Sequence, residues 1–172
     1  VWLEADSLFL PADSLEPAVA LGNVCMKDTV ENWILRGAHA ERLRANSDTR
    51  PDVWIQGSAN ERAEWTDLSA EDTLTLIADT MVFSADLTSV WPNVQLRQGD
   101  SFAECDTLIW SESEAWIQLL KSPKMWLDGW LLRSDSLTWE LVENRPRRLR
   151  AWGHAGLISA LVDSCFQQIA GR

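Results

Sequence analysis

The sequence contains no tyrosine, only two histidines and only three cysteines among its 172 residues. Cys25, Cys105 and Cys165 are far apart and lack the Cys-x-x-Cys spacing of a structural zinc site, so we expect free, half-buried thiols. His39 and His154 do not have the spacing of a metal site, and no serine lies in a Gly-x-Ser-x-Gly motif. These absences predict a protein that is not an enzyme and that uses neither a metal ion nor a cofactor.

Positive charge is scarce as well. The chain has 15 lysines and arginines against 26 acids, which gives a net charge of −11. A phosphate-backbone partner would require a basic stripe, so we expect no nucleic-acid partner. The one basic cluster is typical of a solvated strand end, with an anionic headgroup as the alternative partner; it comprises Arg145, Arg147, Arg148 and Arg150. No apolar run approaches the roughly 18–20 residues that a membrane-spanning helix needs.

Tryptophan, in contrast, is abundant, with eleven residues in the chain. Tryptophan is enriched where one side of a surface is apolar and the other is wet, which fits a surface facing lipid or glycan. Packing in a core is the more frequent role, and the composition leaves both open. With 46% apolar and 24% charged residues, the chain can form a folded core.

A short motif recurs five times along the chain: a small residue, an acid, any residue and a large apolar residue. Its copies are Ala5-Asp6-Ser7-Leu8, Ala40-Glu41-Arg42-Leu43, Ala78-Asp79-Thr80-Met81, Cys105-Asp106-Thr107-Leu108 and Ser134-Asp135-Ser136-Leu137. A second motif follows each acid by 13 to 18 residues, as Gly22-Asn23-Val24, Gly57-Ser58-Ala59, Pro92-Asn93-Val94, Pro123-Lys124-Met125 and Gly153-His154-Ala155. Two motifs in phase predict a repeat protein of about five two-strand units.

The segments around these motifs alternate with a period of two. Val94 and Leu96, for example, alternate with Gln95 and Arg97 before the turn residues at 98–100. Such alternation is typical of half-buried strands, and no long helical stretches separate them. The sequence therefore predicts an all-β fold of repeated antiparallel strands, as a meander or a solenoid.

Residues 157–169 favour a helix by their apolar spacing. The motif at Gly153-His154-Ala155 is in phase with the repeat, however, so we predict two strands with a turn near Asp163-Ser164.

The repeated pair of motifs resembles the OstA-like family of lipopolysaccharide-transport proteins from the periplasm of Gram-negative bacteria. The matching residues are Leu3-Glu4-Ala5-Asp6, Leu21-Gly22-Asn23-Val24, Leu76-Ile77-Ala78-Asp79 and Arg133-Ser134-Asp135-Ser136-Leu137, and the tail from Gly153 to Arg172 is similar to Bacteroidetes-type members. The similarity covers essentially all of residues 1–172, as one domain that we expect to be a piece of a longer protein. Tryptophan stands where such proteins often have tyrosine, and prolines precede Asn93 and Lys124.

The resemblance implies an elongated, half-open β-jelly-roll, often called a β-taco, whose inner face holds lipid acyl chains. It also implies a periplasmic location, with outer-membrane association as a further expectation. Its partners would be lipopolysaccharide or a related lipid, and other lipopolysaccharide-transport components or a second copy, joined edge to edge through unpaired strands. The strands at 2–10 and 165–170 carry few blocking charges, so we predict that they form these edges.

Large apolar side chains of one parity are the candidates for the lipid groove. They are Val24, Met26, Trp33, Leu35, Met81, Phe83, Leu96, Leu108, Trp110, Ile117, Leu119, Met125, Leu127, Leu137 and Trp139, together with Leu43. From the residues alone, an ordinary closed sandwich core explains the same pattern and is the favoured interpretation.

Two other functions remain open: a carbohydrate-binding or adhesive β-solenoid, and a structural spacer. The placement of the tryptophans discriminates glycan binding from lipid binding: a row of outward rings along one face would favour glycan, and an apolar groove with scattered outward rings would favour lipid. We expect Trp126 and Trp130 to have the parity opposite to Met125 and Leu127, so that some tryptophans face outward or lie under a second layer.

Overall fold

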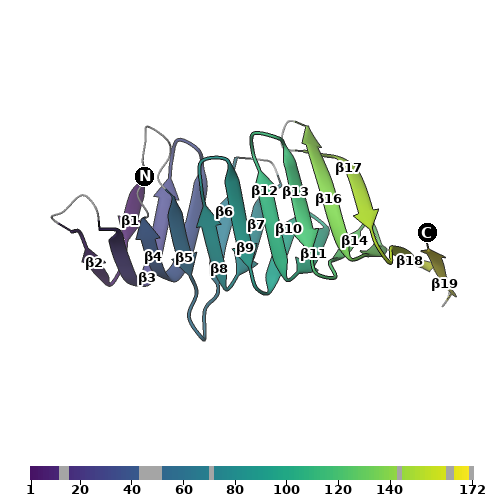
Figure 1. Ribbon diagram of the computed structural model, residues 1–172, viewed down its shortest axis with the longest axis horizontal. Helices are drawn as coiled ribbons and strands as arrows, with labels where there is room; N and C mark the ends of the chain where they lie inside the picture. The colour runs from purple at the N-terminus through teal and green to yellow at the C-terminus, as the bar shows by residue number, and fades with distance from the viewer. Residues whose placement is uncertain (12–15, 43–51, 70–71, 143–144, 162–164, 171–172) are drawn as a thin grey trace.

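The computed structural model describes residues 1–11, 16–42, 52–69, 72–142, 145–161 and 165–170, and the side chains of 145–146 and from 160 onward are not part of that description. All regular structure in these residues is β-strand, arranged in two facing layers along one axis (Figure 1). No helix among them is long and apolar enough to cross a membrane. The all-β prediction is confirmed.

Every strand pair is antiparallel, and the pairs form two layers. Sheet I contains, in spatial order, β1 (Trp2–Glu4), part of β3 (Ala18–Asp28), part of β4 (Trp33–Arg42), β6 (Ala63–Asp67), β7 (Leu74–Ala78), β10 (Val94–Gln98), β11 (Ser101–Cys105), β14 (Lys124–Leu127), β15 (Trp130–Arg133), β18 (Gly156–Leu161) and β19 (Cys165–Ala170).

Sheet II contains β2 (Ser7–Phe9), the other parts of β3 and β4, then β5 (Val53–Gln56), β8 (Thr80–Phe83), β9 (Leu87–Trp91), β12 (Thr107–Ser111), β13 (Trp116–Leu120), β16 (Ser136–Val142) and β17 (Arg145–Trp152). The long strands β3 and β4 bend from one layer into the other, so the two layers are continuous at that end.

The chain passes between the layers along one long edge, which we call the seam. The seam consists of Asp6, Gly22-Asn23, Gly37-Ala38, residues 57–62, Asp79, Pro92-Asn93, Asp106, Lys121-Ser122, Asp135 and Gly153-His154. On the opposite edge, the described connections are hairpins that stay within one sheet. The body is therefore joined covalently along one edge, which gives the half-open shape.

The repeat motifs coincide with the seam, with two corrections. Four of the five acids lie at corners. Glu41 lies within β4, so the prediction that its motif marks a corner is wrong. At Pro123-Lys124 the corner is shifted to Lys121 and Ser122, which have positive φ angles of 62° and 59°. Lys124 is already the first residue of β14.

The two ends of the chain also test the strand predictions. The predicted strand at 2–10 is in fact two strands, because the chain turns at Asp6 from sheet I into sheet II. Residues 157–169 form β18 and β19, so the prediction of strands rather than a helix is confirmed, and the proposed turn at 163–164 lies outside the described residues.

Cross-strand partners line up in rows on the inner faces. One row of sheet II contains Leu8, Ala20, Ala40, Ile55, Met81, Val90, Leu108, Leu119, Leu137 and Ala151. The facing row of sheet I contains Leu3, Met26, Leu35, Trp65, Leu76, Leu96, Ala103, Met125, Leu132 and Leu157. Burying one large aliphatic side chain stabilises the fold by about 1.5–3 kcal/mol, so these rows hold the layers together.

Candidate functional site: the space between the sheets

A cavity of about 340 Å³ lies between the two sheets in the N-terminal half of the body. Sheet I contributes Met26, Trp33, Leu35 and Trp65, and sheet II contributes Val53, Phe83, Thr88 and Trp110. Val1, Asp28, Glu31, Arg42, Ser84 and Glu112 complete the lining. The walls are thus largely apolar and aromatic, as in small-molecule sites generally.

Trp65 connects the two layers beside this cavity. Its ring lies 5.3 Å from that of Trp110 in an edge-to-face arrangement and 6.4 Å from that of Phe83. Trp65 belongs to sheet I, whereas both partners belong to sheet II. Edge-to-face aromatic pairs are favourable because the positive ring edge meets the negative ring face. The cluster therefore fixes the spacing of the sheets where the cavity forms.

Two hairpin turns with acidic residues border the cavity. In the β3–β4 turn, the Asp28 carboxylate accepts hydrogen bonds from the backbone N–H groups of Val30 and Glu31, at 2.8 and 3.0 Å. Glu31 in turn accepts a bond from the Trp33 indole N–H at 3.3 Å. In the β12–β13 turn, which contains Glu112, the Ser111 hydroxyl accepts the N–H of Glu114 at 3.2 Å. Asp and Ser side chains that bond to nearby backbone N–H groups in this way stabilise both turns through local contacts.

The structure divides the groove candidates into two main groups. Met26, Trp33, Leu35, Phe83 and Trp110 line the cavity. Val24, Met81, Leu96, Leu108, Ile117, Leu119, Met125, Leu137 and Trp139 are each no more than 6% exposed. Leu127 is 36% exposed, and Leu43 lies outside the described residues.

Most of the second group packs between the sheets in the C-terminal half. A gap beside Leu96, Met125 and Trp139 has no room for a water molecule. Among the described residues, the space between the sheets therefore contains a cavity in the N-terminal half and closely packed side chains around Leu96, Met125 and Trp139.

The sequence analysis did not name the other residues of the cavity lining, among them Val53, Trp65 and Thr88 on the walls. Trp65 follows the same alternation as its neighbours, between the more polar Glu64 and Thr66, so the period-two pattern contained its signal. Thr88 is 6% exposed and polar, which removed it from any list of large apolar residues.

The tryptophans are divided between the two faces. Trp126 pairs with Phe102 and contacts its ring at 5.2 Å, on the face opposite Met125, as predicted. Trp130 is the cross-strand partner of Leu127 and so shares the inner face, which makes its predicted outward parity wrong. The two-residue turn Asp128-Gly129, with positive φ angles of 49° and 78°, resets the alternation.

Outward tryptophans are dispersed. Trp54, Trp91, Trp116 and Trp152 of sheet II lie on four different strands, and in the described pairings none is the cross-strand partner of another. A glycan-stacking platform would need a row of neighbouring rings, and these four tryptophans of sheet II do not form one.

Along the seam, each Asp pairs with a side chain of a neighbouring corner. Asp6 accepts from the Asn23 amide at 2.9 Å, and Asp135 lies 2.9 Å from His154 Nδ1. Lys121 Nζ lies 2.7 Å from Asp106. Hydrogen bonds from Lys121 and then Thr107 hold the pKa of Asp106 below its usual value. These contacts stabilise the corners of the seam. None of them brings two carboxylates together, as a pair of catalytic acids would require.

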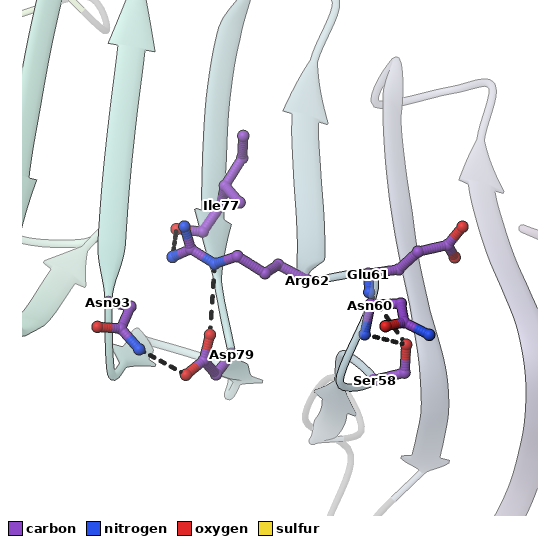
Figure 2. Close-up of polar contacts among 7 residues, drawn as sticks. All are labelled: Ser58, Asn60, Glu61, Arg62, Ile77, Asp79 and Asn93. Atoms are coloured by element: carbon purple, nitrogen blue, oxygen red, sulfur yellow. Dashed lines mark hydrogen bonds and ion pairs between the residues drawn. The ribbon is translucent and has the colours of Figure 1, made fainter.

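Asp79 shows this arrangement in the middle of the seam (Figure 2). One carboxylate oxygen accepts from the Asn93 amide at 2.7 Å, and the other lies 3.3 Å from Arg62 Nε. In the adjacent 57–62 corner, the Ser58 hydroxyl accepts the N–H groups of Asn60 and Glu61. Asp79 thus connects the corners on either side of it.

The described cysteines and His39 pack within the fold. Cys25 and Cys105 are free and half-buried, as expected. Burial, followed by the nearby Asp106 charge, raises the pKa of the Cys105 thiol to about 12, so it stays protonated and is a poor nucleophile. His39 lies in β4, 3.2 Å from Glu41, and contacts the Trp54 ring. Among the described residues, no cluster of three metal-ligating side chains occurs.

No protein-family model and no curated protein sequence matches the chain. Among solved structures, it is similar to LptH of Pseudomonas aeruginosa, the LptA-homologous periplasmic component of a lipopolysaccharide transport device. The TM-score is 0.53 and the identity 16%, over 64% of this chain and 74% of LptH. This chain has the LptH fold. The predicted half-open β-jelly-roll is therefore confirmed, and at this identity the likeness to LptH establishes the fold alone.

Proposed function

We propose that this chain binds lipopolysaccharide or a related lipid in the periplasm and takes part in its transport toward the outer membrane. The observation that carries the proposal is the apolar cavity between the two sheets, in a fold shared with LptH. Its volume of about 340 Å³ corresponds to roughly eleven groups the size of a water molecule, which is enough for part of one acyl chain.

Binding in such a cavity requires no reactive group. Each buried methylene contributes about 0.8 kcal/mol, so affinity grows with the length of chain enclosed. The dispersed outward tryptophans favour this lipid function over glycan binding. The finer placement within the OstA-like family, as a Bacteroidetes-type member, is part of the same proposal and rests on the C-terminal residues.

Phe83→Glu is expected to weaken lipopolysaccharide binding at least about tenfold, because a carboxylate in the cavity wall loses its hydration when a chain enters. Gln118→Glu is the matched control, since it adds the same charge to a residue whose cross-strand partners are Ile109 and Thr138, on the face opposite Ile117. Titration of lipopolysaccharide against tryptophan emission measures both affinities. Equal weakening by the two variants would reject the cavity as the binding site.

We also propose that the chain joins other lipopolysaccharide-transport components, or a second copy, edge to edge. In the described pairings, β1 and β2 are the outermost strands at one end, and β17 and β19 at the other. Trp2, Leu8 and Phe9 are each at least 50% exposed on the first two. An outermost strand has one unpaired backbone edge, and such an edge with exposed apolar side chains readily accepts another strand.

Leu8→Lys is expected to abolish concentration-dependent association, because a charged side chain on an edge strand opposes the pairing of another strand. Leu87→Lys is the control, as Leu87 is 43% exposed but begins β9, which has neighbours on both sides. Light scattering after size-exclusion chromatography reports the mass. Retention of the association by Leu8→Lys, or its loss in Leu87→Lys, would argue against joining through β2.

A further inference from the structure

Thr88 is a buried polar residue in the apolar wall of the cavity. It lines the cavity and is 6% exposed. Its cross-strand partners in sheet II are Phe83 on one side and Trp110 on the other, and both of these also line the cavity. The Thr88 hydroxyl thus interrupts an otherwise apolar row that continues to Val53 at one end and to Ile117 at the other.

The Thr88 hydroxyl has no hydrogen-bond partner among the residues that the structure describes. The indole N–H groups of Trp65 and Trp110, which line the same cavity, have no partner among these residues either. Burying a hydroxyl or an N–H group without a partner is costly, so most such groups in proteins are hydrogen-bonded. These three groups are therefore available to a ligand that enters the cavity.

Thr88 lies close to the edge where the cavity meets the hairpin turns. It is the first inward-facing residue of β9 after the β8–β9 turn, which contributes Ser84 to the lining. The next inward-facing residue, Val90, is fully buried between Met81 and Leu108. The charged residues of the lining lie at this same edge, in turns or at strand ends. A polar head is thus expected at the turns and an alkyl tail between the sheets, with Thr88 beside the first carbons of the tail.

We propose that the cavity selects an acyl chain that carries a hydroxyl group close to its head, and that Thr88 recognises this hydroxyl by a hydrogen bond. This inference rests on the proposed function, because it assigns a chemical feature of the lipid that the cavity holds. A hydroxyl suits the site because it can donate to Thr88 Oγ1 and accept from an indole N–H at the same time. Small-molecule pockets generally combine apolar walls with a few polar groups of this kind, which fix the orientation of the ligand.

The test uses the full chain and three probes of equal length and equal charge: dodecanoate, 3-hydroxydodecanoate and 12-hydroxydodecanoate, each below its micelle concentration. A change in tryptophan emission reports binding, since three tryptophans line the cavity. The measured quantity is the affinity for a hydroxylated chain divided by the affinity for dodecanoate. For the 3-hydroxy chain, this ratio should be about three- to tenfold higher in the unmodified chain than in Thr88→Val, which lacks one hydrogen bond. For the 12-hydroxy chain, whose hydroxyl lies at the tail end, the two proteins should give the same ratio.

Valine replaces the threonine hydroxyl by a methyl group, so Thr88→Val should leave the affinity for dodecanoate unchanged. Its urea midpoint should not fall, because the hydroxyl has no hydrogen bond to lose in the free protein. Thr88→Ser keeps the hydroxyl and should keep the higher ratio. Thr138→Val is the matched control, because Thr138 pairs with Gln118 and Arg150 on the outer face of sheet II, opposite the buried Leu137. Its ratio should equal that of the unmodified chain.

An equal ratio in the unmodified chain and in Thr88→Val, or an equal fall in Thr138→Val, would overturn recognition by Thr88 while lipid binding stood. A lowered urea midpoint for Thr88→Val would also overturn it, since the hydroxyl would then have a partner within the fold. Failure of all three probes to bind would overturn lipid binding in the cavity itself, because dodecanoate needs only the apolar walls.

Discussion

Trp65→Ala is expected to lower the free energy of unfolding by about 3–5 kcal/mol, the usual cost of removing a large buried aromatic side chain. Trp65 is 8% exposed and is the residue of sheet I that meets both Trp110 and Phe83 of sheet II. Its removal leaves a void between the layers beside a cavity that the structure already has. The surrounding strands cannot collapse fully into that void, because their backbones are held by neighbours on both sides.

Urea denaturation followed by circular dichroism measures this change through the midpoint, with the slope checked for constancy. Trp126→Ala is the control: Trp126 is half-buried on the outer face, where its contact with Phe102 is the main loss, so we expect about 0.5–1.5 kcal/mol. Trp65→Phe keeps an apolar ring and should retain most of the stability. If Trp126→Ala cost as much as Trp65→Ala, the aromatic contact between the sheets would not be what fixes their spacing.

The repeat motifs predicted the seam well because the corners impose local chemistry. Gly22 and Gly153 have φ angles of 71° and 65°, and at both positions an Asp carboxylate, of Asp6 or Asp135, occupies the place of a Cβ. The corner therefore requires glycine at these two positions. The next residue, Asn23 or His154, contacts the Asp carboxylate, so the pair is visible in the sequence.

Glu41 was misassigned because its repeat has a different corner. At Gly37, a Cβ would lie 2.7 Å from Ile55 Cγ1 and 2.9 Å from the carbonyl oxygen of Gln56. The neighbouring strand thus fills the space that the acid occupies in the other repeats. That close approach is a tertiary contact, and the motif Ala40-Glu41-Arg42 carries no sign of it.

The alternation of apolar and polar residues predicted which side chains face inward, but not where a cavity remains between the two sheets. Met26 and Leu119 both point inward by period two, yet the first lines a cavity and the second is 1% exposed in packed surroundings. The difference depends on how the side chains of the two layers fit together across the body, which no pattern within one strand records. The parity error at Trp130 has a different cause, because there a two-residue turn within one hairpin shifts the alternation.

The measurement that tests the account most directly is photo-crosslinking of lipopolysaccharide by benzoylphenylalanine placed at single positions. Phe83 and Met26 line the cavity, whereas Gln95 and Gln118 lie on the faces opposite Leu96 and Ile117 and serve as controls. Phe83 is the mildest replacement, because one aromatic side chain takes the place of another. Circular dichroism of each variant verifies that the strands are retained.

The account predicts lipopolysaccharide adducts at Phe83 and Met26 and none at Gln95 or Gln118, because the acyl chains lie between the sheets. Adducts at the two glutamine positions alone, or at none of the four in folded protein, would contradict it and leave the inner face as an ordinary closed core.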